Sequence, residues 1–295
     1  MALLDIIALA LIQGITEFLP ISSSGHLVLY PLLTGRPDQG VRMDVAVHFG
    51  TLIAVCLYFR AETAGLFRGG VDILLRRWAT PEARLAFLVG VASIPAVAAG
   101  FALKATGGDL ALRSVEVIGW ATLLGGLLLW AADAWGRQDR RAATPGPEDG
   151  PSDAGGWTLR DAVLMGLAQA LALVPGTSRS GITMTAARAL GFERAEAARI
   201  SLVMAIPLIL AASAVETVGL MDGAALTRAA ADGSLIVESR LEVAIDIAIG
   251  AALACLAALA ALWAMFRMFR GAWTMLPFVL YRLALGGGLL ALAYA

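Results

Sequence analysis

The stretch "EFLPISSSGH" (residues 17–26) lies inside an apolar N-terminal region and contains a carboxylate, three hydroxyls and an imidazole. Its proline interrupts a helical run of about 15–17 residues, and the next apolar run, ending at Gly35, is only about eight or nine residues long. At 1.5 Å per residue, the second run extends only about 12–14 Å into an apolar layer about 30 Å thick. Region 1–34 therefore predicts a helical hairpin that enters a membrane and returns to the same side.

A second stretch repeats this pattern. "GLAQALALVPGTSRSGITM" (166–184) and "LIQGITEFLPISSSGHLVL" (11–29) both run from a glutamine through an apolar segment to a proline, a hydroxyl cluster and a glycine. The spacing between the glutamine and the proline differs by one residue between the two stretches. Region 159–191 therefore predicts a second hairpin, and the repetition is typical of a chain built from two related halves.

The composition indicates a membrane protein. The chain of 295 residues is 59% hydrophobic and 15% charged, with a mean hydropathy of +0.79, whereas soluble domains carry about 25% charged residues. A formal net charge of −1 gives no basic surface for nucleic acid. Six stretches are apolar and close to the length needed to cross a bilayer. They are residues 41–60, 83–104, 112–135, 195–219, 240–266 and 272–294.

The number of membrane crossings predicts how the two halves are oriented relative to each other. We expect an all-α polytopic membrane protein with six transmembrane helices and two re-entrant helical hairpins. Residues 1–135 form the first repeat, 136–158 a polar cytoplasmic linker, and 159–295 the second repeat. A hairpin returns to its own side and three spans change sides, so the second repeat starts from the opposite face. The pattern predicts an inverted-topology repeat, with a site near the membrane midplane.

Arginine predicts the orientation, because Lys104 is the single lysine of the chain. Arginines gather in three connections that alternation places on one side, namely 60–84, 136–158 and 267–270. That side should be cytoplasmic by the positive-inside rule. Both termini and the mouth of the first hairpin are then expected outside. The stretch 61–78, with apolar residues among its arginines, predicts a helix on the cytoplasmic surface.

Three ionisable residues, Glu17, His26 and Arg179, lie at the predicted hairpin tips, where a charge in lipid is costly. Arg179 has two interpretations: a structural ion pair with Glu17, or a planar fork that binds phosphate. The second is favoured because each break precedes a helix whose N-terminal N–H groups would bind an anion. An anion at that depth is best explained as a phosphate with an apolar tail. The residues expected to bind it are Gln13, Ser22, Ser24, Gly25, Gly176, Thr177, Ser178, Ser180 and Gly181.

Glu17 and His26 add reactivity to this anion site. A carboxylate beside an imidazole holds its tautomer, so Glu17 is expected to orient His26. A serine among residues 22–24 or the imidazole itself would then attack phosphorus. Gln13 and Glu17 share a helix face, and their oxygens suit a divalent cation, Mg²⁺ or Ca²⁺, beside a pyrophosphate.

The remaining polar residues of the spans have ordinary structural interpretations. His48 lies within a plain span and is expected to pack there. Cys56 and Cys255 lie about 200 positions apart in apolar runs and are expected to pack as thiols. Acidic residues at span ends are expected to be interfacial anchors; these are Asp44, Glu116, Glu216, Glu242 and Asp246.

Five segments carry a resemblance to a known family: "QGITEFLPISSSGHL" (13–27), "DVAVHFGTLIAV" (44–55), "ASIPA" (92–96), "GLAQALALVPGTSRSGITMTAA" (166–187) and "ARISLVMAIP" (198–207). Together they resemble the bacitracin-resistance protein family of undecaprenyl-pyrophosphate phosphatases. One family motif, Glu or Gln followed four positions later by Glu, is matched by Gln13 and Glu17. The other, PGxSRSxxT, is matched from Pro175 to Thr183.

The resemblance implies removal of the terminal phosphate of undecaprenyl pyrophosphate, which recycles the lipid carrier for peptidoglycan synthesis and confers bacitracin resistance. It also implies a divalent cation, a bacterial inner-membrane location and a site open to the periplasm. Gln13 stands where a second glutamate is common, which leaves one carboxylate for the metal. The expected partners are the lipid pyrophosphate and membrane lipid, with a homodimer as a candidate assembly. The family match assigns function to Glu17, Ser23, His26, Ser178 and Arg179, supported by Gln13, Ser24 and Thr177.

Other classes fit the residues less well. A secondary transporter or lipid flippase uses the same inverted repeat but needs no reactive pair such as Glu17 and His26. A structural scaffold leaves the charges at membrane depth unexplained. The segment "PGTSRSG" (175–181) lacks the spacing and lysine of a nucleotide P-loop. Membrane acid phosphatases that use phosphohistidine need a second histidine after the "SR" pair, and this chain has none there.

Overall fold

The computed structural model describes residues 2–36, 40–107, 112, 114–135, 156–220, 227–229, 235–237, 239–271 and 273–295. For residues 216–220 and the two short strands it describes the backbone only. The predicted linker 136–158 lies outside the described residues, apart from its last three positions.

Six helices are long and apolar enough to cross a membrane, which confirms the six predicted spans. They are α3 (Gly40–Tyr58), α5 (Pro81–Ala105), α7 (Val115–Trp135), α10 (Arg194–Leu220), α11 (Arg240–Phe269) and α12 (Leu276–Tyr294). Among the described residues, the only strands are a short antiparallel pair between α10 and α11, formed by β1 (Thr227–Ala229) and β2 (Leu235–Val237). The chain is otherwise helical, as the sequence predicts.

Each predicted hairpin region is a pair of short helices separated by an irregular break. The first pair is α1 (Leu3–Thr16) and α2 (Ser23–Thr34). The second consists of α8 (Leu159–Ala170), the 3-10 turn η1 (Leu171–Leu173) and α9 (Arg179–Ala189). The two breaks coincide with the Pro- and Ser-rich stretches. Because α2 has 12 residues and α9 has 11, both are longer than the predicted eight or nine.

A separate helix, α4 (Arg60–Leu74), follows the first long helix, as predicted for the arginine-rich stretch. It packs against α5 through Gly69, where an added Cβ would lie 1.9 Å from the Glu82 carbonyl oxygen. Its outer face carries the exposed apolar side chains of Phe67, Val71 and Leu74. An arginine-containing helix with such a face is typical of the membrane surface, and its position there stays a prediction.

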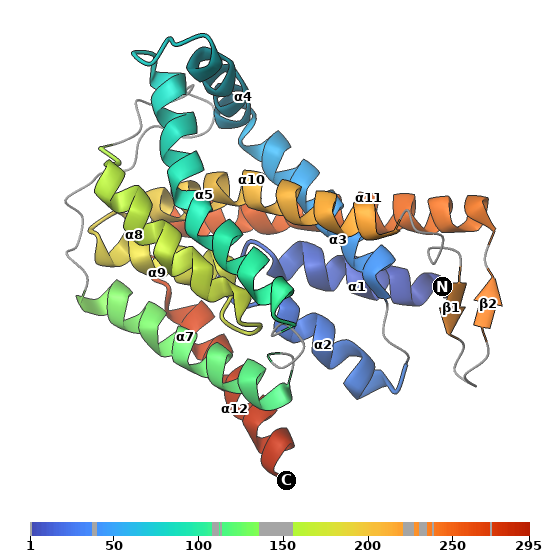
Figure 1. Ribbon diagram of the computed structural model, residues 1–295. Helices are drawn as coiled ribbons and strands as arrows, with labels where there is room; N and C mark the ends of the chain where they lie inside the picture. Colours follow the sequence, from blue (N-terminus) through green and yellow to red (C-terminus); the bar gives the residue numbers. More distant parts are fainter. Residues whose placement is uncertain are drawn as a thin grey trace.

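Helix α10 lies at the centre of the bundle. Of its candidate span, 61% is buried, compared with 28–44% for the other five. Around it, α3 packs on α11 and α7 packs on α12. The short helices fill matching places: α1 lies along α11, and α8 lies along α5 (Figure 1).

Two glycines allow the short helices this close approach. A Cβ on Gly14 of α1 would lie 2.6 Å from the Ala254 carbonyl oxygen of α11. A Cβ on Gly166 of α8 would lie 2.6 Å from the Ala92 carbonyl oxygen of α5. Small residues at helix contacts are the usual basis of packing between membrane helices. Both hairpins are therefore held backbone against backbone.

A buried carboxylate fixes the far end of the second hairpin. Asp133 Oδ1 accepts hydrogen bonds of 2.9 Å from the Nε of both Arg188 and Arg194. Its Oδ2 accepts a 3.1 Å bond from the backbone N–H of Met275. The ends of α7 and α9 are thus joined to the starts of α10 and α12.

Candidate functional site

The two breaks meet inside the bundle and bond to each other. Ser24 Oγ accepts a 3.3 Å hydrogen bond from the Gly176 N–H. Ser180 Oγ donates a 2.9 Å bond to the Leu19 carbonyl oxygen. Each break thus uses a serine to hold the backbone of the other, and the predicted meeting of the two stretches is confirmed. We call the region formed by residues 17–26 and 174–181 the cradle.

The helices that leave the cradle begin with the same unusual cap. Ser22 has φ 77° and Ser178 has φ 67°, in a region that non-glycine residues rarely adopt. Ser22 Oγ accepts from the Gly25 N–H at 3.4 Å, and Ser178 Oγ accepts from the Gly181 N–H at 3.1 Å. The first N–H groups of α2 and α9 have no helical partner, so two partial positive charges converge at the cradle.

Glu17 is the central acceptor of the cradle. Its side chain is buried, and its Oε2 accepts from Ser23 Oγ at 2.7 Å and from Gln13 Nε2 at 2.8 Å. Its Oε1 accepts from Arg179 Nη2 at 2.8 Å. One carboxylate therefore contacts a hydroxyl of the first hairpin and the guanidinium of the second.

Arg179 makes the ion pair with Glu17 that the sequence left as one alternative. That pair does not saturate its donors, because Nη1 is buried and has no partner among the described residues. A buried donor without a partner is costly in a native protein. The guanidinium therefore retains a donor for an anion while it pairs with the carboxylate, and the two interpretations are compatible.

His26 is held by groups other than Glu17. Its Nδ1 lies 2.7 Å from the Ser22 carbonyl oxygen, and its Nε2 lies 2.5 Å from the hydroxyl of Tyr281 on α12. A carbonyl can only accept, so Nδ1 carries the proton and, in the neutral ring, Nε2 accepts from the tyrosine. The expectation that Glu17 orients His26 is wrong. The carboxylate contacts Ser23 instead, and the imidazole contacts the Ser22 carbonyl and Tyr281 of α12.

Residues of the long helices complete the cradle, and the sequence did not single them out. Arg282 of α12 is fully buried, and its Nη2 donates to the carbonyl oxygens of Thr177 at 2.9 Å and Gly176 at 3.2 Å. Its Nη1 donates to Pro20 at 3.4 Å, so it holds both breaks. An arginine within an apolar span is the same signal that marked Glu17. Tyr281 carries no such signal.

The charges around the cradle favour an anion. Arg282 contacts no carboxylate in the part of the chain that the structure describes. The cradle therefore contains two guanidinium groups, those of Arg179 and Arg282, and one carboxylate, that of Glu17. Buried charges need a counter-ion, and helix N-termini supply further positive potential. A phosphate or pyrophosphate group meets both requirements.

The cradle has oxygen ligands for a hard cation, but few. No group of three His, Cys, Asp or Glu side chains that would hold a metal occurs among the described residues. Glu17 supplies a carboxylate, and Gln13 Oε1 is buried without a partner. Mg²⁺ is commonly held by one or two carboxylates together with phosphate oxygens and water. Glu17 and Gln13 therefore fit a divalent cation only if phosphate oxygens and water supplied its remaining ligands.

Comparisons with known proteins identify the family to which this chain belongs. The family described as "Bacitracin resistance protein BacA" matches residues 6–288. A protein of Ruegeria pomeroyi named "Undecaprenyl-diphosphatase" is 50% identical over 295 residues, which cover all of both chains. A protein of the same name from Dinoroseobacter shibae is 47% identical over the full length of both chains. "Undecaprenyl-diphosphatase 2" of Stutzerimonas stutzeri is 44% identical, covering 99% of this chain and 98% of its own. This chain belongs to the bacitracin resistance protein BacA family.

Proposed function

We propose that this membrane protein removes the terminal phosphate of undecaprenyl pyrophosphate and releases undecaprenyl phosphate and inorganic phosphate. The names of its relatives support this substrate. The observation that carries the proposal is the shared contact of Glu17 with Ser23 and Arg179, beside two helix N-termini. A nucleophile, a base and anion-binding donors thus lie within one hydrogen-bonded group.

Ser23 is the nucleophile in this proposal. Its Oγ is already bonded to Glu17 Oε2 at 2.7 Å, so the carboxylate takes the proton as the oxygen attacks. A bond forms between Ser23 Oγ and the terminal phosphorus, and the bond from that phosphorus to the bridging oxygen breaks. Undecaprenyl phosphate leaves, and water then releases phosphate from the serine. His26 is the weaker candidate because both of its ring nitrogens are engaged.

Arg179 and the helix N-termini hold the reacting phosphate. Nη1 of Arg179 has no partner within the described part of the chain, and a phosphate oxygen would satisfy it. A phosphate that draws the guanidinium away also loosens its 2.8 Å pair with Glu17, which leaves the carboxylate freer to accept a proton. Donors placed where charge develops lower the barrier to phosphoryl transfer. His26 is a positioning residue that, with Tyr281, fixes the turn at Ser22.

Two residues of the cradle would hold a divalent cation beside the bound pyrophosphate. Glu17 and the Oε1 of Gln13 are the residues that would hold it. When bound, it neutralises the pyrophosphate and favours departure of the leaving phosphate. Mg²⁺ and Ca²⁺ both suit these oxygen ligands.

The two helix pairs are re-entrant hairpins of an inverted repeat in this proposal. In the first half, α1 packs on the second span of the other half, α11. In the second half, α8 likewise packs on α5, the second span of the first half. This exchange, together with the paired caps at Ser22 and Ser178, supports a pseudo-twofold relation between residues 1–135 and 159–295. The arginine distribution supports a bacterial inner-membrane protein whose termini and active site face the periplasm.

Phosphate release from farnesyl pyrophosphate by the purified protein in detergent tests this function. We expect turnover that a chelator abolishes and that Mg²⁺ or Ca²⁺ restores. Glu17→Gln should lower kcat by about 10³-fold, measured below the melting temperature of the variant, which the loss of the buried ion pair should lower. Absence of phosphate release by folded protein with either cation would contradict the proposal. Prenyl-phosphate counterflow in liposomes under those conditions would instead indicate a lipid carrier.

A further inference from the structure

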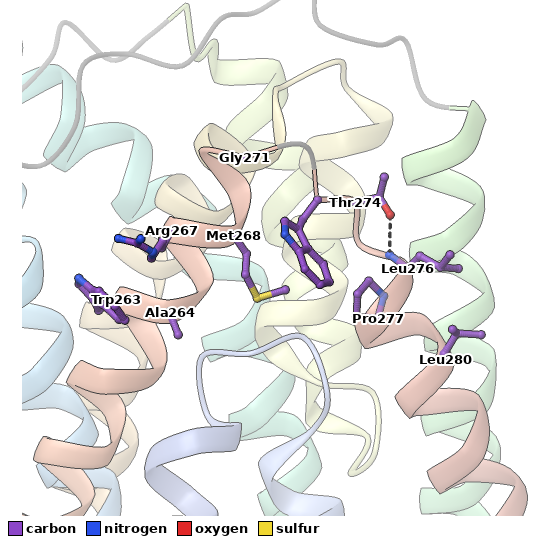
Figure 2. A pocket seen from close by; sticks show the side chains of 10 residues that line it. Trp263, Ala264, Arg267, Met268, Gly271, Thr274, Leu276, Pro277 and Leu280 are labelled. Atoms are coloured by element: carbon purple, nitrogen blue, oxygen red, sulfur yellow. Dashed lines mark hydrogen bonds between the residues drawn. The ribbon is translucent and has the colours of Figure 1, made fainter.

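A surface groove of about 850 Å³ lies between the last turns of α11 and the first turns of α12 (Figure 2). Its walls come from Ala264 and Met268 of α11 and from Pro277 and Leu280 of α12. Trp273, in the turn that joins the two helices, also lines the groove. The groove shares no residue with the cradle, and its volume suits a drug-sized or lipid-chain ligand.

The groove is open on the outer surface of the helix bundle. Trp263 is 60% exposed, Trp273 57% and Leu280 58%. In a bundle that spans a membrane, an outward apolar surface contacts acyl chains, and tryptophans near span ends are typical of the headgroup level. The groove is therefore placed where one end meets lipid tails and the other meets headgroups.

One cation stands at the headgroup end of this groove. Among the described residues that line the groove, Arg267 is the only charged one, and its guanidinium carbon lies 5.4 Å from the ring centroid of Trp263. Where the structure describes the chain, neither Arg267 nor the nearby Arg270 forms a salt bridge. A guanidinium at a membrane surface without a protein counter-ion is complementary to a phosphate headgroup.

We propose that the groove binds one anionic phospholipid, with an acyl chain between Met268 and Leu280 and its phosphate on Arg267. The apolar walls account for the chain, and the unpaired guanidinium accounts for the charge. This site goes beyond the proposed hydrolysis and uses none of its residues. It lies at the arginine-rich connection between α11 and α12.

Quenching of tryptophan fluorescence by brominated lipids tests the proposal in vesicles. Brominated phosphatidylglycerol should bind about five-fold more tightly than brominated phosphatidylcholine, as expected for one arginine near an anionic lipid. Because Trp263 and Trp273 both line the groove, the double substitution Trp263→Phe and Trp273→Phe should remove the saturable part of the quenching and so identify its origin. Arg267→Gln should abolish the preference for phosphatidylglycerol. Arg68→Gln, at an exposed arginine of α4, should preserve it.

Two further arms make the outcome decisive. Ala264→Phe fills the groove from an exposed position and should weaken quenching by both lipids, which separates the chain from the headgroup. Glycerol phosphate at millimolar concentration should leave the quenching unchanged. Equal quenching by the two lipids, equal effects of the two arginine substitutions, or displacement by glycerol phosphate would each overturn the proposal.

Discussion

In both breaks of the chain, a serine with positive φ caps the next helix. The Oγ of a second serine, two positions later, lies 3.2–3.3 Å from the Oγ of the first. The residue between them differs: it is Ser23 in the first break and Arg179 in the second. Four positions after the capping serine stands His26 in the first break and Ile182 in the second. The backbone conformation is thus repeated while the side chains differ: the proposed nucleophile, Ser23, lies in the first break and the guanidinium of Arg179 lies in the second.

This difference shows that functional candidates from the two halves contact each other. Glu17 belongs to the first break but accepts from Arg179 of the second at 2.8 Å. Substitutions at matched positions of the two breaks therefore separate what the shared backbone does from what each side chain adds. Substitutions that affect only the shared backbone conformation should have equal effects in the two breaks. Substitutions of side chains that take part in the reaction should have unequal effects.

The largest effect is expected at the position between the paired serines. Ser23→Ala should lower kcat by about 10⁴-fold or more, because it removes the attacking oxygen. Ser24→Ala, which removes only the bond to the Gly176 N–H, is the matched control and should cost about ten-fold or less. Phosphate release from farnesyl pyrophosphate measures both. A phospho-enzyme with acid-labile rather than acid-stable character would move the nucleophile to His26.

The matching position of the second break should respond differently. Arg179→Ala should lower kcat/KM by about 10³-fold, since the phosphate loses its guanidinium donors. Arg179→Lys should recover only part of this loss, because an ammonium cannot serve Glu17 and a phosphate through a planar fork. The same assay at several substrate concentrations separates KM from kcat. Full activity of the lysine variant would show that charge alone suffices there.

The glutamines before the two breaks sharpen the comparison. Gln13 donates to Glu17 at 2.8 Å, whereas its counterpart Gln169 donates to the Ala92 carbonyl oxygen at 3.2 Å. Gln13→Ala should therefore raise the cation concentration needed for half-maximal activity by about ten-fold. Gln169→Ala should leave that concentration unchanged and lower the melting temperature instead. A cation titration of both variants, with thermal unfolding, decides between these roles. Equal shifts in cation dependence would contradict the asymmetry.

The smallest effect is expected from the caps, where the two breaks are alike. Ser22→Ala and Ser178→Ala each remove the oxygen that accepts from the N–H of a glycine three positions on. Each should lower the free energy of unfolding by about 1 kcal/mol. Denaturation in detergent measures both, and their similarity is the prediction. A loss confined to one of them would show that the matched geometry hides different roles.

The sequence predicts the elements of this fold well because hydropathy and breakers act locally. Apolar length identifies the six long helices, and proline followed by hydroxyls identifies both breaks. The pair Glu17–Arg179 could also be anticipated, since charges at membrane depth need partners. These inferences depend only on what lipid tolerates at a given depth.

The contacts of His26 could not be predicted in this way. Glu17 and His26 are nine positions apart across a break whose direction depends on Ser22 at φ 77°, which no local pattern specifies. The hydroxyl that reaches the imidazole comes from Tyr281, 255 positions away. How α12 crosses the cradle is decided by packing between long helices, to which the spacing of polar residues gives no access.

The position of Arg282 on α12 has a consequence for the assembly of the cradle. This guanidinium bonds to carbonyls of both breaks from α12 (Leu276–Tyr294). Glu17 and Ser23 belong to the first hairpin, so the cradle is complete only after α12 has packed against both breaks. A protein truncated before α12 would contain Glu17 and Ser23 without the arginine that joins the two breaks. The cradle is therefore formed by the assembled bundle, and neither hairpin forms it alone.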